Sequence, residues 1–149
     1  RLDLSVNILT MHAYFSGVIS ILGGNQKRPN IHIKDMVRAY LHVLSQPREK
    51  INGKTFNVGY ENHTISELAQ MVKEVIDPHV RIIITPTNDN RSYHISSEKI
   101  KRELGFVPKF TIKDAIRDLK DAFDKGLLID PLNNKRYYNI KTMQTLNLK

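Results

Sequence analysis

Apolar residues recur at helical spacing in several segments of the chain. Residues 2–16 carry two apolar sets on different faces, which predicts a helix buried on most of its sides. Amphipathic helices, each with one apolar face, are predicted at residues 36–46, 65–76 and 112–125. A shorter helix is expected to start at Ser96 or Ser97 and to end at Gly105.

Short apolar or alternating runs between these helices are typical of strands. They are VISIL at 18–22, NIHIK at 30–34, TFNVG at 55–59 and VRIIIT at 80–85. Because these strands alternate with helices, we expect an α/β fold with parallel pairing. The last 23 residues, 127–149, lack clear periodicity and are expected to form an extended tail over the surface, or to be partly disordered.

Local signals mark where the helices begin and end. Asp35 is expected to cap the helix that follows it, and Thr64 with Glu67 forms the spacing of a capping box. Thr111 is expected to cap the last long helix. Gly17 suits a left-handed helix end, because glycine adopts positive φ without Cβ strain.

Composition narrows the class of protein. The 149 residues carry 23 Lys and Arg against 15 Asp and Glu, a net charge of +8 that favours anionic partners. The absence of cysteine excludes disulfides and thiolate metal sites and fits a reducing compartment. The N-terminal residues do not resemble a signal peptide, and no apolar run is long enough for a membrane helix. A cytoplasmic globular protein is therefore expected.

The stretch GGNQKRPN, residues 23–30, is the first candidate for anion binding. A Gly-Gly turn precedes Lys27 and Arg28, and Pro29 stiffens the backbone after them. An arginine fork matches phosphate oxygens two at a time, and Arg91, at the exit of another strand, could reach the same anion. From the residues alone, solvated surface loops are the better explanation of both arginines.

Other catalytic patterns are weak. The six histidines are scattered without metal-ligand spacing, so no metal site is expected. His32 alternates with two isoleucines and is expected on the polar face of a strand. Tyr137 and Lys141 match Tyr-x-x-x-Lys, but they lie in the aperiodic tail, where chance explains the match best.

Several segments, taken in order, resemble a known family. RLDLSVN, ILGGNQKRPNIHIKD, TFNVG, RSY and LGFVP are similar to the C-terminal half of extended short-chain dehydrogenases/reductases, and more narrowly to the NAD-dependent epimerase/dehydratase group that acts on nucleotide sugars. The resemblance covers residues 1–126 and leaves 127–149 as a tail. It implies the last parallel strands and helices of a Rossmann-type fold together with a small α/β substrate-binding lobe.

The resemblance also implies roles for individual residues. Asn7 and Arg28 match positions that contact the diphosphate of the nucleotide sugar, and Arg91 matches an arginine that closes over the nucleotide from the other side. The strand that ends at Leu22 matches the segment that lines the base. His32 and Asp35 match an H-x-x-D element whose role is structural capping.

The chain departs from the family pattern in two respects. It has neither the glycine-rich NAD-binding motif nor a Tyr-x-x-x-Lys in the family's place, so the resemblance implies that NAD and catalysis need the N-terminal NAD-binding half of the same protein. In the intact enzyme, the sugar would be oxidised through a keto intermediate. This chain alone would be inactive and would supply the diphosphate and base contacts. His94 stands where many members of the family have aspartate. The resemblance therefore does not carry over the contacts to the sugar part of the ligand.

Two alternatives from other classes stay open. One is a basic nucleic-acid-binding domain, although acids are interleaved with the cations and no stacking aromatics lie in a basic strand pair. The other is a structural interaction module that buries an incomplete sheet against a partner. Exposed strand edges also predict that the isolated chain is a truncation product, or that it self-associates, as in a homo-oligomer.

Overall fold

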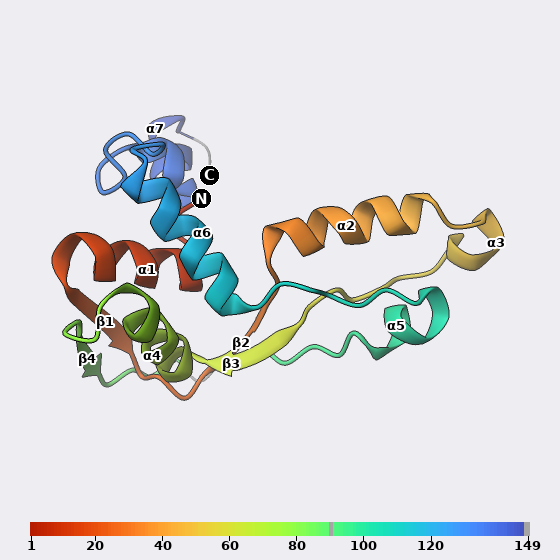
Figure 1. Ribbon diagram of the computed structural model, residues 1–149, viewed down its shortest axis with the longest axis horizontal. Helices are drawn as coiled ribbons and strands as arrows, with labels where there is room; N and C mark the ends of the chain where they lie inside the picture. The colour runs from red at the N-terminus through yellow and green to blue at the C-terminus, as the bar shows by residue number, and fades with distance from the viewer. Residues whose placement is uncertain (90, 148–149) are drawn as a thin grey trace.

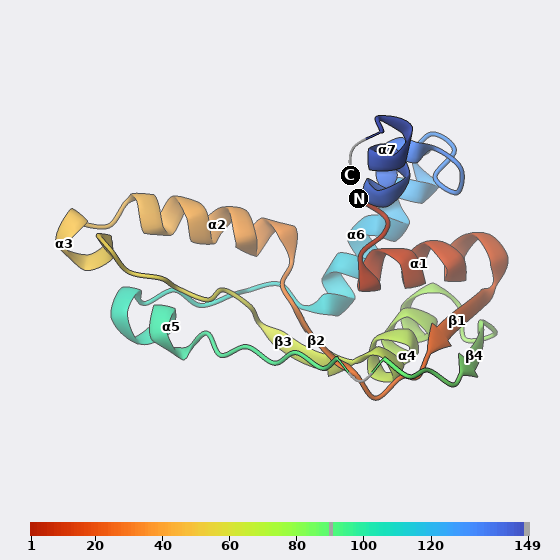
Figure 2. The ribbon, with the colours of Figure 1, turned by 180° about the vertical axis from the view of Figure 1, so that it is seen from behind.

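The elements form two regions at opposite ends of the long axis (Figure 1; Figure 2 shows the molecule from behind). The computed structural model describes residues 1–89 and 91–147. One region contains α1 (Ser5–Ser16), β1 (Val18–Leu22), α4 (Ile65–Ile76), β4 (Arg81–Thr85) and α6 (Ile112–Asp124), with η1 (Lys135–Tyr137) and α7 (Asn139–Thr145) beside them. The other contains α2 (Ile33–Leu44), α3 (Arg48–Ile51) and α5 (Glu98–Leu104). Strands β2 (Lys27–Asn30) and β3 (Glu61–Thr64) lie between the two regions.

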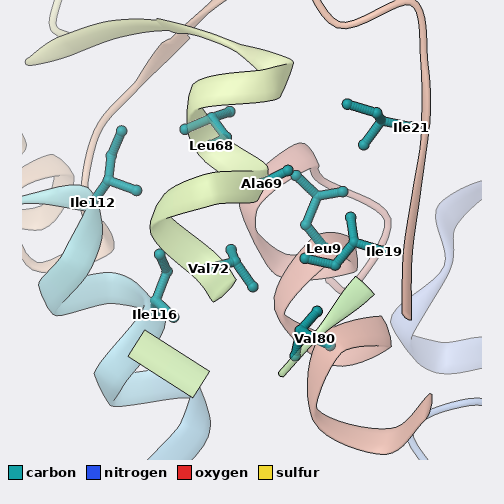
Figure 3. Packing of buried hydrophobic residues seen from close by; sticks show 10 residues of the cluster. Leu9, Ile19, Ile21, Leu68, Ala69, Val72, Val80, Ile112 and Ile116 are labelled. Atoms are coloured by element: carbon teal, nitrogen blue, oxygen red, sulfur yellow. The ribbon is translucent and has the colours of Figure 1, made fainter. Parts of the chain in front are cut away.

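The main core is built on the parallel pair β1 and β4, in register from Val18 opposite Arg81 to Leu22 opposite Thr85. This pairing confirms the α/β prediction. Helices α1 and α4 contact β1, and α6 contacts both helices. Figure 3 shows their apolar faces meeting around β1; the buried residues are Leu9, Ala13, Ile19, Ile21, Leu68, Ala69, Val72, Val80, Ile112 and Ile116.

The predicted ends of α1, α4, α5 and α6 at Gly17, Thr64, Gly105 and Thr111 agree with the structure. Capping boxes form at Thr64 with Glu67 and at Thr111 with Asp114. Gly17 and Gly105 follow α1 and α5 in the left-handed conformation. These ends depend on bonds between residues close in sequence, which is why local patterns predict them.

The predicted strand at 30–34 is wrong. β2 ends at Asn30, and α2 already begins at Ile33. The N-cap is His32 rather than Asp35: the His32 Nδ1 accepts a hydrogen bond of 3.1 Å from the backbone N–H of Lys34. His32 is also buried, not on an exposed polar face.

Asp35 has a different structural role from the expected one. It lies in the first turn of α2, is fully buried, and pairs with Arg38. Its Oδ2 accepts 2.8 Å bonds from the backbone N–H groups of Lys109 and Phe110. Because these partners are more than 70 positions away in the sequence, local pattern could not identify them.

The predicted buried strand at 55–59 is also wrong. Residues 55–59 do not form a strand. The next strand along the chain is β3, which pairs antiparallel with β2. Phe56 and Val58 instead pack on a second cluster, formed by Ala39, Ile100, Leu104 and Phe106. β3 has the sequence ENHT and no apolar alternation, so periodicity did not reveal it.

Residues 127–147 differ from the expected extended tail, because they include η1 and α7. Tyr138 anchors this part in a third cluster with Leu2, Met11 and Phe123, and its hydroxyl donates to the carbonyl of Pro131 at 2.9 Å. The division of the chain after residue 126 stays a prediction. Within the described ranges, every helix is too short or too polar to cross a bilayer.

Candidate functional site

An open pocket of about 270 Å³ lies beside the end of β1, and we call it the Arg28 pocket. It brings together the start of α1, the end of β1, the turn into β2 and the segment after β4. Its lining residues are Ser5, Ile8, Leu9, Ser20, Ile21, Leu22, Gln26, Arg28, Ile65, Thr87 and Asp89.

The Gly23-Gly24 turn places Arg28 at this pocket. Both glycines have positive φ, 75° and 121°, which lets the chain leave β1 and turn into β2. At Gly24, the positive φ would strain any other residue, and a Cβ atom would also lie 2.2 Å from the Ser66 Oγ, which would have to rotate away. The backbone N–H of Ser66 donates to the Gly24 carbonyl at 3.0 Å.

Arg28 is held by neighbouring backbone. Its Nη1 donates to the carbonyl of Arg91 at 2.7 Å and to that of Lys27 at 2.9 Å. Its guanidinium also lies 5.3 Å from the ring centroid of Tyr93. These contacts orient the side chain before any ligand is present.

Further bonds join the segment after β4 to the turn before β2. The backbone N–H of Lys27 donates to Ser92 Oγ at 3.0 Å, and the N–H of Tyr93 donates to the Lys27 carbonyl at 3.0 Å. Gln26 Nε2 donates to the Asp89 carbonyl at 3.2 Å. The two segments that carry the predicted arginines are therefore adjacent.

Arg91 makes a two-point ion pair with Asp89. Its Nε and Nη2 each donate at 2.7 Å, one to each carboxylate oxygen. Hydrogen bonds from Arg91 hold the pKa of Asp89 far below its usual range, and the charge of Arg28 contributes in the same direction. The same pair raises the pKa of Arg91.

Of the four predicted site residues, two line the Arg28 pocket. Leu22 and Arg28 line the pocket, while Arg91 reaches its edge through Asp89. Asn7 is not among the lining residues; its side-chain amide donates to the Arg1 carbonyl at 2.7 Å. The ligand roles of all four stay predictions.

Asp89 is an acidic pocket residue that the sequence did not single out. It stood within a polar run after the strand, and the only signal was an acid two positions before Arg91. Gln26 and Thr87 were missed for the same reason, since only the turn geometry brings them to the pocket.

The residues present do not form the usual NAD site. Gly23-Gly24 leads into strand β2, whereas a dinucleotide-binding loop leads into a helix N-terminus that receives the diphosphate. Within the described ranges, no three His, Asp or Glu side chains are grouped as metal ligands. Tyr137 and Lys141 lie in separate elements, η1 and α7, and the Lys141 ammonium lies over Tyr138 instead, 4.1 Å from its ring centroid.

Comparison with known proteins points to one family. Residues 5–59 match the model of the NAD dependent epimerase/dehydratase family. The chain is 33% identical over 114 residues to UDP-D-apiose/UDP-D-xylose synthase 2 of Arabidopsis thaliana, covering 63% of this chain and 28% of that protein. It is 30% identical over 107 residues to UDP-glucose 4-epimerase of Corynebacterium glutamicum, covering 70% and 32%. The chain thus spans about a third of the length of these curated relatives.

The fold agrees with this similarity. The crystal structure of UDP-glucose 4-epimerase from Thermotoga maritima with UDP-glucose superposes with a TM-score of 0.69 at 24% identity, over 83% of this chain and 40% of that one. The shared fold is of the Rossmann type, with the parallel pair β1 and β4. The chain belongs to the NAD dependent epimerase/dehydratase family and corresponds to part of an extended short-chain dehydrogenase/reductase.

Proposed function

We propose that the chain binds the diphosphate of a nucleotide sugar at the Arg28 pocket, as the C-terminal portion of an NAD-dependent sugar epimerase or dehydratase. The observation that carries the proposal is the position of Arg28: it lines the pocket together with Leu22 and is bonded to the backbone of Arg91. An arginine fork held in place by backbone contacts is suited to a diphosphate, because little ordering is left to occur on binding.

The rest of the pocket suits the other parts of such a ligand. Ile8, Leu9 and Ile65 present apolar surface, and Ser5 and Ser20 add hydroxyl groups. A planar base binds between apolar side chains and a few polar groups that fix its orientation. The names of the relatives, which include UDP-sugar enzymes, support the same ligand class.

The proposed reaction needs more than these residues. The chain supplies ligand contacts, and an NAD-binding half supplies the cofactor and the reacting groups, so this chain alone is expected to be inactive. NAD takes hydride from the sugar in such enzymes. In the comparison with the Thermotoga maritima enzyme, 60% of that protein's length lies outside the aligned part.

Helix α2 offers a surface for that half. One side of α2 carries apolar residues that are half or more exposed: Ile33, Val37, Tyr40, Leu41 and Leu44. An open hollow of about 430 Å³ lies between α2 and residues 54–58, the segment that was expected to be a strand. Burial of such a face is favourable by roughly 25 cal/mol per Å² of apolar surface. We assign this face to contact with the NAD-binding half of the protein.

The test of the proposed function is a ligand panel on the 149-residue chain. UDP, dTDP, CDP and their sugars are screened by thermal shift, and the Kd of the best ligand is measured by calorimetry. We expect one base to be preferred and Arg28→Ala to weaken binding by about tenfold to a hundredfold, the value of one charge-assisted bond.

Arg102→Ala is the matched control, because it removes the same charge from an exposed side chain on α5. It should leave the Kd unchanged. Binding that is equal in both variants, or absent for every nucleotide, would contradict the proposal. Duplex DNA binding with a steep salt dependence would favour the nucleic-acid alternative.

A further inference from the structure

Both arginines at the Arg28 pocket already have partners within the chain. Arg28 donates to two backbone carbonyls. Arg91 gives two of its five N–H donors to Asp89. The Asp89 side chain itself lines the pocket, so a negative charge lies at the place where an anionic ligand would come.

The Asp89 carboxylate has the charge and geometry of a bound anion. Its two oxygens take the Nε and Nη2 donors of Arg91 in the parallel arrangement that carboxylates and phosphates share. The nearby charge of Arg28 favours its ionised form as well. Its backbone carbonyl is fixed by Gln26, which holds the residue against the turn before β2.

We propose that Asp89 is an internal anion that competes with the ligand's diphosphate for Arg91. The inference rests on the proposed function, because it takes a nucleoside diphosphate as the ligand of this pocket. On binding, Arg91 exchanges carboxylate oxygens for phosphate oxygens, and Asp89 turns away from the added negative charge. Asp89 thereby disfavours ligands with less charge than a diphosphate.

The Asp89–Arg91 ion pair is exposed, so breaking it for the exchange costs little free energy. The Arg91 side chain is 72% exposed and that of Asp89 is 33% exposed. Exposed ion pairs change an equilibrium constant by at most about fivefold. The competition therefore tunes affinity without closing the pocket to the ligand.

The experiment measures UDP and UMP binding by calorimetry for the unchanged chain, Asp89→Asn, Arg91→Ala and the double variant, with dTDP run in parallel. Asp89→Asn should lower the Kd for UDP by about two- to fivefold, because it removes the competing charge and keeps the shape of the side chain. The same substitution should lower the Kd for UMP by at least the same factor. In the Arg91→Ala background, the same change should bring a smaller gain, because the competition for Arg91 is already lost.

Glu49→Gln is the control for the change in net charge. Glu49 is exposed on α3, at the opposite end of the long axis from β1 (Figure 1), and its loss should not alter UDP binding. If Asp89→Asn binds UDP as well as or more weakly than the unchanged chain, Asp89 positions Arg91 and the inference is overturned, while the proposed function stands. If neither UDP nor dTDP binds any variant, this inference fails, and the proposed function fails with it when CDP and the nucleotide sugars do not bind either.

Discussion

His32 and Asp35 lie side by side at the start of α2, and both are buried. His32 caps the helix, while Asp35 joins α2 to residues 109 and 110 through two backbone N–H groups. A buried carboxylate is tolerated only where donors satisfy it, and Arg38 completes the set. At the scale of single residues, Asp35 is therefore the link between α2 and the strand-free segment before α6.

Removal of this carboxylate should be costly. Asp35→Ala leaves the backbone N–H groups of Lys109 and Phe110 and the Arg38 guanidinium without their acceptor, and we expect the free energy of unfolding to fall by about 3 kcal/mol. Urea denaturation followed by circular dichroism measures it. Asp121→Ala, at an exposed position of α6, should change the value by less than about 0.5 kcal/mol. Equal losses in the two variants would show that the Asp35 bonds contribute nothing specific.

At the scale of elements, the two capping boxes decide where α4 and α6 begin. In α6, Thr111 Oγ1 accepts from the backbone N–H of Asp114 at 3.2 Å, and the Asp114 carboxylate accepts from the backbone N–H of Thr111 at 2.9 Å. The Thr111 hydroxyl, which donates to the Asp114 carboxylate at 2.7 Å, and the Thr111 backbone N–H together lower the pKa of Asp114. Because α6 packs on both α1 and α4, its first turn also fixes the main core.

Thr111→Ala should therefore destabilise the whole chain and not only the helix end. The expected loss is about 1 kcal/mol in the free energy of unfolding, from one missing cap acceptor. Thermal and urea unfolding measure it. Thr111→Ser keeps the hydroxyl and should recover most of the stability. A serine variant as unstable as the alanine variant would point to lost packing of the methyl group.

At the scale of the whole molecule, the elongated arrangement leaves α2 with an apolar face that nothing in the described chain covers (Figure 1). The main core stabilises the region around β1. The region of α2, α3 and α5 is stabilised by the smaller cluster of Ala39, Ile100, Leu104 and Phe106. A molecule of this shape has a large surface for its length, so less apolar area is buried within the chain.

The isolated chain should self-associate through this face, because the described residues leave its apolar side chains exposed. Leu41→Lys with Leu44→Lys puts two charges on side chains that are 62% and 76% exposed, and should shift sedimentation velocity profiles toward monomer. Leu127→Lys, at a position 69% exposed beyond α6, is the control and should leave association unchanged. Persistence of the oligomer in the double variant would place the contact elsewhere.

Local pattern was sufficient wherever an element is stabilised by its own residues. The helices α1, α4 and α6, their caps and the strands β1 and β4 follow from apolar spacing and from cap residues a few positions apart. Arg28 was identified in the same way, by a turn and a cation before a strand. The helices and their caps depend on bonds within about four residues, and a single sequence contains that information. The strands β1 and β4 were recognisable as short apolar runs, although their pairing spans about 60 positions.

Tertiary structure decided the features whose partners are distant. The burial of Asp35 depends on residues 109 and 110, and the pairing of β2 with β3 spans more than 30 positions. The pocket forms because Asp89, Ser92 and Tyr93 are bonded to Gln26 and Lys27. The sequence by itself determined the α/β class, the main helices and the basic turn. Which backbone holds Arg28 was decided by the folded chain, because the Arg91 carbonyl that accepts from its guanidinium lies 63 positions away in the sequence.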